Sequence, residues 1–211
     1  MKQTLITLAL LFSISFAYGQ QLYLDVFTGY NRTAYETNIY ENRASYLSAG
    51  ARVAVGADHF QLGGEARTNL TDPSFDLINR NEEHSETYYG AFIRSKIAKY
   101  PAMRFGLVLR AGAGLHNFET RYENLTTNSV KYDPVLGLNG GVGFSIPAFR
   151  AVMVELGYAY HYVTRPEIQA GGIIVQEFNS SYHALQAGLS LNLVFGKRAE
   201  EYRKIRESQR W

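Results

Sequence analysis

The stretch Tyr182–Phe195, YHALQAGLSLNLVF, alternates apolar residues with small and polar ones. One face carries Leu185, Ala187, Leu189, Leu191, Leu193 and Phe195, and the other carries Ala184, Gln186, Gly188, Ser190 and Asn192. Successive side chains of a β-strand point to opposite faces of the sheet. Six successive apolar residues facing small and polar ones, with an aromatic residue at the end, are typical of a membrane-spanning strand whose polar face lines a barrel interior.

The composition agrees with this interpretation. The chain of 211 residues contains 16 Tyr, 12 Phe and 19 Gly at a mean hydropathy of -0.20, which suits an aromatic-rich and glycine-rich barrel. The absence of cysteine excludes disulfides and thiolate metal sites, and the net charge of +2 gives no reason to expect nucleic acid as a partner. After the N-terminal segment, no run approaches the roughly 20 apolar residues of a transmembrane helix. Any membrane crossing must therefore use strands.

The chain divides into three parts. Residues 1–19 resemble a secretory signal peptide, with a basic Lys2, an apolar stretch Leu5–Phe16 and the small residues Ala17 and Gly19 before Gln20. Residues 20–196 form the predicted barrel. Residues 197–211 form a charged tail, which we expect on the periplasmic side.

The alternation of Tyr182–Phe195 recurs in seven earlier segments. They are Leu22–Tyr30, Ser45–Ala57, Phe60–Leu70, Glu86–Ile97, Met103–His116, Val135–Ile146 and Val152–Val163. The long connections, predicted to be polar loops, are Asn31–Arg43, Thr71–Ser85, Asn117–Pro134 and Thr164–Ser181. Long and short connections alternate, as in barrels with short periplasmic turns and longer external loops. The pattern predicts an all-β fold, an eight-stranded antiparallel up-and-down transmembrane β-barrel with both termini in the periplasm.

On these features the chain resembles the small eight-stranded outer-membrane β-barrel family, which includes the transmembrane domain of outer-membrane protein A. The resemblance covers residues 22–195 and implies a monomer in the outer membrane of a Gram-negative bacterium, surrounded by outer-membrane lipid. It also implies that Leu189, Leu191, Leu193 and Phe195 form the signal read by the barrel assembly machinery. In the family this signal ends the chain, whereas here Gly196–Trp211 follows.

The inward positions of the predicted strands carry many charged or titratable residues. They are Asp25, Arg52, Glu65, Arg67, Arg94, Lys96, Arg104, Arg110, Glu155 and His161. An eight-stranded barrel is just wide enough for side chains to fill it, so one interpretation is a paired network that plugs the interior. The alternative is a narrow channel gated by an ion pair of Arg110 with Glu65 or Glu155. Because basic residues outnumber acidic ones, such a channel would weakly prefer anions.

Two further classes remain open. A lipid-modifying enzyme would need a base beside a nucleophile. The candidates are His161 with Thr164, or His183 with Ser180 or Ser181 and Glu177, although neither set has a His-x-Ser spacing on one strand face. We expect no enzyme, no cofactor and no metal site. A secreted barrel with an apolar interior would instead place the charged residues outside. The leading hypothesis is a structural or surface-interaction barrel whose surface ligand the sequence does not identify.

Overall fold

The computed structural model describes residues 21–36, 44–57, 59–77, 80–97, 105–122, 129–149, 151–170, 173–175 and 178–195, with residues 199 and 204. The predicted signal peptide, Arg104 and nearly all of the predicted tail lie outside these residues. Within them, no helix is long and apolar enough to cross a membrane.

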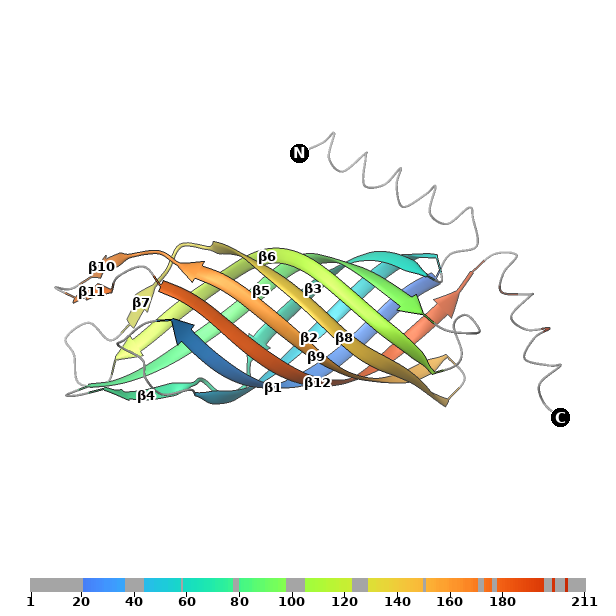
Figure 1. Ribbon diagram of the computed structural model, residues 1–211, viewed down its shortest axis with the longest axis horizontal. Helices are drawn as coiled ribbons and strands as arrows, with labels where there is room; N and C mark the ends of the chain where they lie inside the picture. Colours follow the sequence, from blue (N-terminus) through green and yellow to red (C-terminus); the bar gives the residue numbers. More distant parts are fainter. Residues whose placement is uncertain are drawn as a thin grey trace, which may run out of the picture.

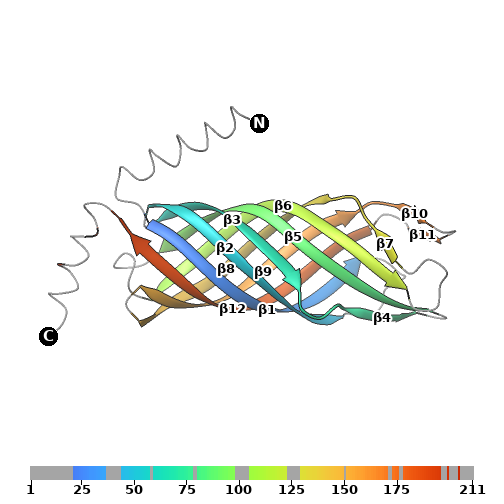
Figure 2. The ribbon, with the colours of Figure 1, turned by 180° about the vertical axis from the view of Figure 1, so that it is seen from behind.

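Eight long strands form a closed antiparallel barrel (Figure 1 and Figure 2). They are β1 (Gln21–Glu36), β2 (Ser45–Ala57), β3 (Phe60–Asn69), β5 (Arg80–Ile97), β6 (Gly106–Tyr122), β8 (Val135–Phe149), β9 (Val152–Arg165) and β12 (Phe178–Val194). Each pairs with its neighbours along the chain, and β1 pairs with β12 to close the ring. The predicted eight-stranded up-and-down barrel is confirmed.

The register of the ring determines its width. A path around the ring that steps from each residue to its direct partner on the next strand starts at Asp25 on β1 and returns to β1 at Tyr35. It passes through Arg52, Glu65, Gly90, Gly114, Gly137, Val163 and Ser180. The stagger of the closed ring is therefore ten residues along β1. With eight strands, this stagger and the usual strand spacings give a tilt of about 40° and a radius of about 8 Å. Side chains alone can fill such an interior.

The two faces of the wall differ in chemistry as the alternation predicted. Arg52, Arg67 and Arg94 are buried inside, whereas Leu109 and Leu189 are exposed on the outside. We call the exposed apolar exterior the belt. It includes Leu24, Val26, Leu47, Val53, Leu62, Ile93, Leu109, Leu138, Val142, Phe144, Leu156 and Leu189. This arrangement contradicts a secreted barrel with an apolar interior.

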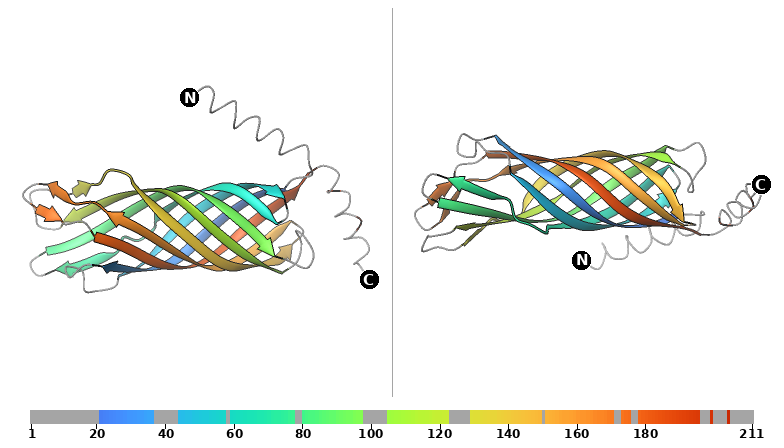
Figure 3. Two further views of the ribbon diagram at one scale, coloured as in Figure 1. Left: turned by 45° about the horizontal axis from the view of Figure 1, so that its top comes forward. Right: turned by 90° about the horizontal axis from the view of Figure 1, so that it is seen from below.

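One end of the barrel continues beyond the belt (Figure 3). Four short strands lie there: β4 (Ser74–Leu77), β7 (Ser129–Lys131), β10 (Ile168–Ala170) and β11 (Ile173–Val175). β4 pairs with β5 and β7 pairs with β6, and β10 and β11 form a separate hairpin. We call these four strands, with the flanking parts of β5 (Arg80–Ser85) and β6 (Phe118–Tyr122) and with Tyr132 after β7, the crown.

The crown corrects the prediction of polar loops at Thr71–Ser85, Asn117–Pro134 and Thr164–Ser181. Much of each segment is strand, because backbone pairing continues where the outer face no longer has to be apolar. The alternation that marks a membrane strand disappears there, so the sequence pattern could not reveal these strands. The crown also has packed side chains: Phe118 and Tyr132 are buried against Val163 at the outer end of β9. It is an ordered extension of the barrel.

Glycines on the inner face make room for aromatic rings. A Cβ at Gly50 would lie 2.5 Å from Cζ of Phe27 and 2.6 Å from the carbonyl oxygen of Ala66. A Cβ at the outward-facing Gly64 would instead meet only the Gly90 carbonyl oxygen, at 3.7 Å. Small residues inside the ring are therefore a packing requirement, whereas this outer glycine is not.

We predict that Gly50→Val lowers the free energy of unfolding by about 1–3 kcal/mol, because overpacking a filled interior forces side chains and backbone to shift. Gly64→Ala, the matched control, should change it little. Urea unfolding of the two variants in lipid vesicles, followed by heat-modifiable gel mobility, measures the difference. Equal stability of the two variants would contradict the filled interior.

Candidate functional site

Arg52 on β2 occupies the centre of the lumen and bridges three other strands. Its Nε donates to Oε2 of Glu65 at 2.6 Å, and its Nη1 donates to Oδ2 of Asp25 at 2.8 Å. Its Nη2 donates to Oε1 of Gln186 at 2.6 Å, and the guanidinium lies 3.6 Å from the ring centroid of Phe27. A planar guanidinium suits this role because its donors spread in a fixed fork. The cluster therefore joins four consecutive strands of the ring, β3, β2, β1 and β12.

A second cluster surrounds Arg94 on β5. Its Nη2 pairs with Oε1 of Glu155 from β9, and its Nη1 donates to Oε1 of Gln61 at 2.8 Å. The hydroxyl of Tyr23 donates to the other oxygen of Glu155 at 2.9 Å, and Arg94 lies 4.2 Å from the centroid of the Tyr23 ring. Both carboxylate oxygens of Glu155 thus have a donor, as a buried charge requires.

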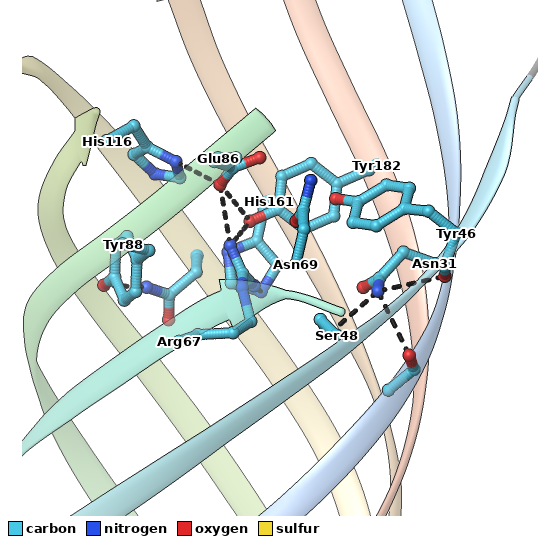
Figure 4. Close-up of polar contacts among 12 residues, drawn as sticks. Asn31, Tyr46, Ser48, Arg67, Asn69, Glu86, Tyr88, His116, His161 and Tyr182 are labelled. Carbon is cyan, nitrogen blue, oxygen red and sulfur yellow. Dashed lines mark hydrogen bonds and ion pairs between the residues drawn. The ribbon is translucent and has the colours of Figure 1, made fainter. Parts of the chain in front are cut away.

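A third cluster is centred on Glu86, nearer the crown (Figure 4). Its Oε1 accepts from Nη2 of Arg67 at 2.8 Å, from Nδ1 of His116 at 2.8 Å and from the hydroxyl of Tyr182 at 3.2 Å. His161 stacks on Tyr182 with centroids 4.4 Å apart and contacts Nη1 of Arg67 through Nε2 at 3.0 Å. Side chains from β3, β5, β6, β9 and β12 therefore meet across the lumen.

The crown contains a separate polar group beyond the belt. Nε2 of His84 lies 3.2 Å from Oε2 of Glu82, and Nη1 of Arg165 lies 3.5 Å from Nδ1 of His84. Burial lowers the pKa of His84 to about 4, although its hydrogen bond with Glu82 acts in the opposite direction. The ring is therefore neutral at pH 7. The described residues contain no group of three acidic or histidine side chains that could hold a metal ion.

The structure places nine of the ten predicted inward residues inside the barrel, and Arg104 is outside the described residues. The pairing differs from the suggested gate, because Glu65 pairs with Arg52 and Glu155 with Arg94. Arg110 instead donates to Oε1 of Gln186 at 3.0 Å, and its buried Nη1 has no partner among the described residues. Lys96 donates to Oγ of Ser145 at 3.3 Å.

Sequence reasoning did not select several residues that complete these clusters. They are Tyr23, Gln61, Glu86, His116, Tyr182 and Gln186. All six occupy inward positions of the alternating strands, so parity could have found them. Selection by formal charge omitted the tyrosines and glutamines, which supply neutral donors and acceptors between the ions. Glu86 and His116 are ionisable, but they are the end residues of the predicted segments Glu86–Ile97 and Met103–His116.

The residues considered for an enzyme do not assemble. His161 is buried inside the barrel, whereas Thr164, three positions along β9, has the opposite, outward parity. His183 is exposed on the outside and Ser180 is buried inside, and Glu177 lies outside the described residues. Ser181 has the same parity as His183 but is buried and lies two residues along the same strand, and the side-chain hydrogen bond of His183 is with Tyr158.

The predicted assembly residues lie at the end of the ring. Leu189 is exposed on β12, and Leu191 and Leu193 follow on the same outward face, opposite Leu24 and Leu22 of β1. Phe195 comes directly after the strand. Their recognition by the assembly machinery stays a prediction.

No protein-family model matches the chain, and no curated protein sequence matches it. Among solved structures, Neisserial surface protein A is similar at 14% identity and a TM-score of 0.62, over 81% of this chain and 96% of that one. The chain has the fold of the small eight-stranded outer-membrane β-barrels. Two further barrels have lower TM-scores. Ail of Yersinia pestis has 11% identity and a TM-score of 0.49, over 82% of this chain and 99% of that one. The N-terminal domain of Pseudomonas aeruginosa OprF has 10% identity and a TM-score of 0.48, over 80% of this chain and 97% of that one.

The belt of this outer-membrane barrel has the chemistry of a lipid-facing surface. Apolar side chains stand exposed on every long strand, and exposed tyrosines (Tyr30, Tyr89, Tyr158 and Tyr160) lie at its crown side. Aromatic residues concentrate at membrane interfaces, where one end of the ring meets water. The belt and the fold together place the protein in the outer membrane of a Gram-negative bacterium.

We predict that an arginine in the middle of the belt destabilises the barrel more than one at its crown edge. Leu109 is near the middle of the outward apolar row that runs from Phe105 to Leu115, and Leu136 is the first outward leucine of β8 below the crown. Leu109→Arg should cost about 2–4 kcal/mol and Leu136→Arg about 0–1 kcal/mol, because the cost of a cation depends on depth. Equilibrium unfolding in phospholipid vesicles compares the two. The reverse order would overturn the proposed position of the membrane.

Proposed function

We propose that the protein is a closed, non-enzymatic barrel that supports the crown at the cell surface for structural or binding purposes. The observation that supports this is the succession of three buried polar clusters in the lumen, centred on Arg94, Arg52 and Glu86. The Arg52 cluster joins four adjacent strands, and the other two clusters join strands that are not neighbours in the ring. Opening a path would require breaking buried ion pairs, whose partners would be left uncompensated. The separation of the candidate nucleophiles from the histidines argues against catalysis.

A narrow channel is the second candidate, and one observation favours it. Arg110 has an unpartnered Nη1 and lines a small lumen cavity of about 10 Å³, together with Asp25, Glu155 and Gln186. That volume is close to the space that one water molecule needs. A rearrangement of Arg110 would be the smallest change able to enlarge it.

Planar-bilayer recording separates the two candidates. For a closed barrel we expect the wild type and Arg110→Ala to be silent, and Arg52→Ala combined with Glu65→Gln to conduct, because the central cluster is then dismantled. Wild-type openings that Arg110→Ala abolishes or enlarges would establish the channel instead. Heat-modifiable mobility checks that each variant is folded, and Gly64→Ala serves as a folded control outside the lumen.

The place of the crown at the cell surface has its own test. Because the chain lacks cysteine, single cysteines can be labelled without background. We predict that Lys131→Cys in the crown reacts with a membrane-impermeant maleimide on intact cells. Ala57 is the last residue of β2, at the end of the barrel opposite the crown. Ala57→Cys should therefore react only after the outer membrane is permeabilised. Labelling of Ala57→Cys alone on intact cells would invert the barrel and remove the proposed surface role.

A further inference from the structure

Two basic side chains stand next to each other on the outside of the barrel. Arg32 on β1 is directly paired with His183 on β12, and both are exposed. Directly opposite residues on one face of an antiparallel pair have Cβ atoms about 4.5–5.5 Å apart. Ser45 on β2, also exposed, is paired with Arg32 on its other side. A row of serine, arginine and histidine therefore crosses three strands.

This row lies at the outer edge of the belt. The next outward residues toward the belt are Tyr30 and Leu185, which are 52% and 64% exposed. In the other direction, β1 and β12 continue past the belt on the side of the crown. The row is therefore at the depth where lipid headgroups begin, just outside the hydrocarbon region.

Neither residue has an acidic partner in the described part of the chain. The ion pairs found there involve other residues of the lumen and the crown. By contrast, the exposed Arg121 of the crown lies 3.7 Å from Glu119 and 3.9 Å from Asp72. Basic groups directly opposite one another favour an anion between them, especially where lipid lowers the local dielectric.

The position of His183 is determined by two tyrosines of β9. Its Nδ1 is hydrogen-bonded to the hydroxyl of Tyr158, and the Tyr160 ring centroid lies 5.3 Å from that of His183. When the hydroxyl donates to Nδ1, the ring N–H is on Nε2. Nε2 is then a donor, like the guanidinium of Arg32, and both could serve the same anion.

An apolar groove begins beside this row and follows the belt. Its volume is about 620 Å³, and its walls include Tyr30, Leu47, Leu156, Tyr158, Leu185 and Ala187. Tyr30 and Leu185 are thus both the neighbours of the basic row and part of the groove. The small Ala187 lies between larger side chains on either side, as the floor of a groove for a chain-like apolar group would.

We propose that Arg32 and His183 bind the phosphate of an outer-leaflet lipid whose acyl chain occupies this groove. The basic row supplies charge-assisted hydrogen bonds to the phosphate oxygens, and the groove supplies apolar contact along the chain. The site is on the lipid-facing exterior, so it does not depend on whether the lumen conducts or on what the crown binds.

Native mass spectrometry of the folded full chain from maltoside micelles tests the proposal. The probe is phosphatidic acid with two 14-carbon chains, and diacylglycerol with the same chains is the control lipid. We expect phosphatidic acid to bind the wild type at least about tenfold more strongly than diacylglycerol, because the control lacks the charged acceptor. Arg32→Gln combined with His183→Gln should remove this preference, and Arg32→Lys should retain part of it.

Two controls make the result specific. Arg121→Gln removes an exposed crown arginine that already has acidic neighbours, and it should leave binding unchanged. Ala187→Trp fills the groove, and it should weaken phosphatidic acid binding without affecting the weak binding of inorganic phosphate. The proposal is wrong if both lipids bind the wild type equally, if the double variant keeps the preference, or if inorganic phosphate competes as effectively as the lipid. Both Gln substitutions are at exposed positions, and heat-modifiable mobility verifies folding.

Discussion

The width of the closed ring is the constraint on which the rest of this structure depends. A ten-residue stagger over eight strands leaves an interior that side chains fill, so polar groups inside must satisfy one another. Arg52 does so by donating to Asp25, Glu65 and Gln186 from three other strands. The same width explains why Gly50 faces the Phe27 ring, since a larger residue would have no space there. The filling of the lumen by side chains and the stability expected from its close packing thus both follow from the width of the ring.

The exterior follows a different rule, because lipid replaces water as the solvent. Apolar side chains are favourable there, and an exposed basic group needs a reason. Arg32 and His183 are notable on this ground, since they lie at the edge of the belt and the exposed arginine of the crown, Arg121, has acidic neighbours. An anionic headgroup would supply what the described part of the protein does not. Lipid contact would then be specific at one place on an otherwise generic surface.

The crown marks the limit of reading strands from alternation. The pattern located the membrane part of β5 from Glu86 onward, but the structure begins the strand at Arg80. Beyond the belt both faces meet polar surroundings or the crown's own small core, so no period of two remains in the sequence. Pairing there relies on backbone hydrogen bonds and on contacts such as that of Phe118 on β6 with Tyr132, which follows β7. These contacts could not be inferred from spacing.

The sequence by itself determined the number of membrane strands, their order and the face on which each side chain lies, because alternation is a local property and lipid demands it in every strand. It also placed Glu65, Arg110 and Glu155 inside. Only the tertiary structure decided that Glu65 pairs with Arg52, that Glu155 pairs with Arg94, and that Arg110 turns to Gln186. Those partners lie up to 76 residues apart, and which of them meet depends on the stagger of the closed ring and on the reach of each side chain across the lumen. Neither quantity is encoded in the pattern of any single strand.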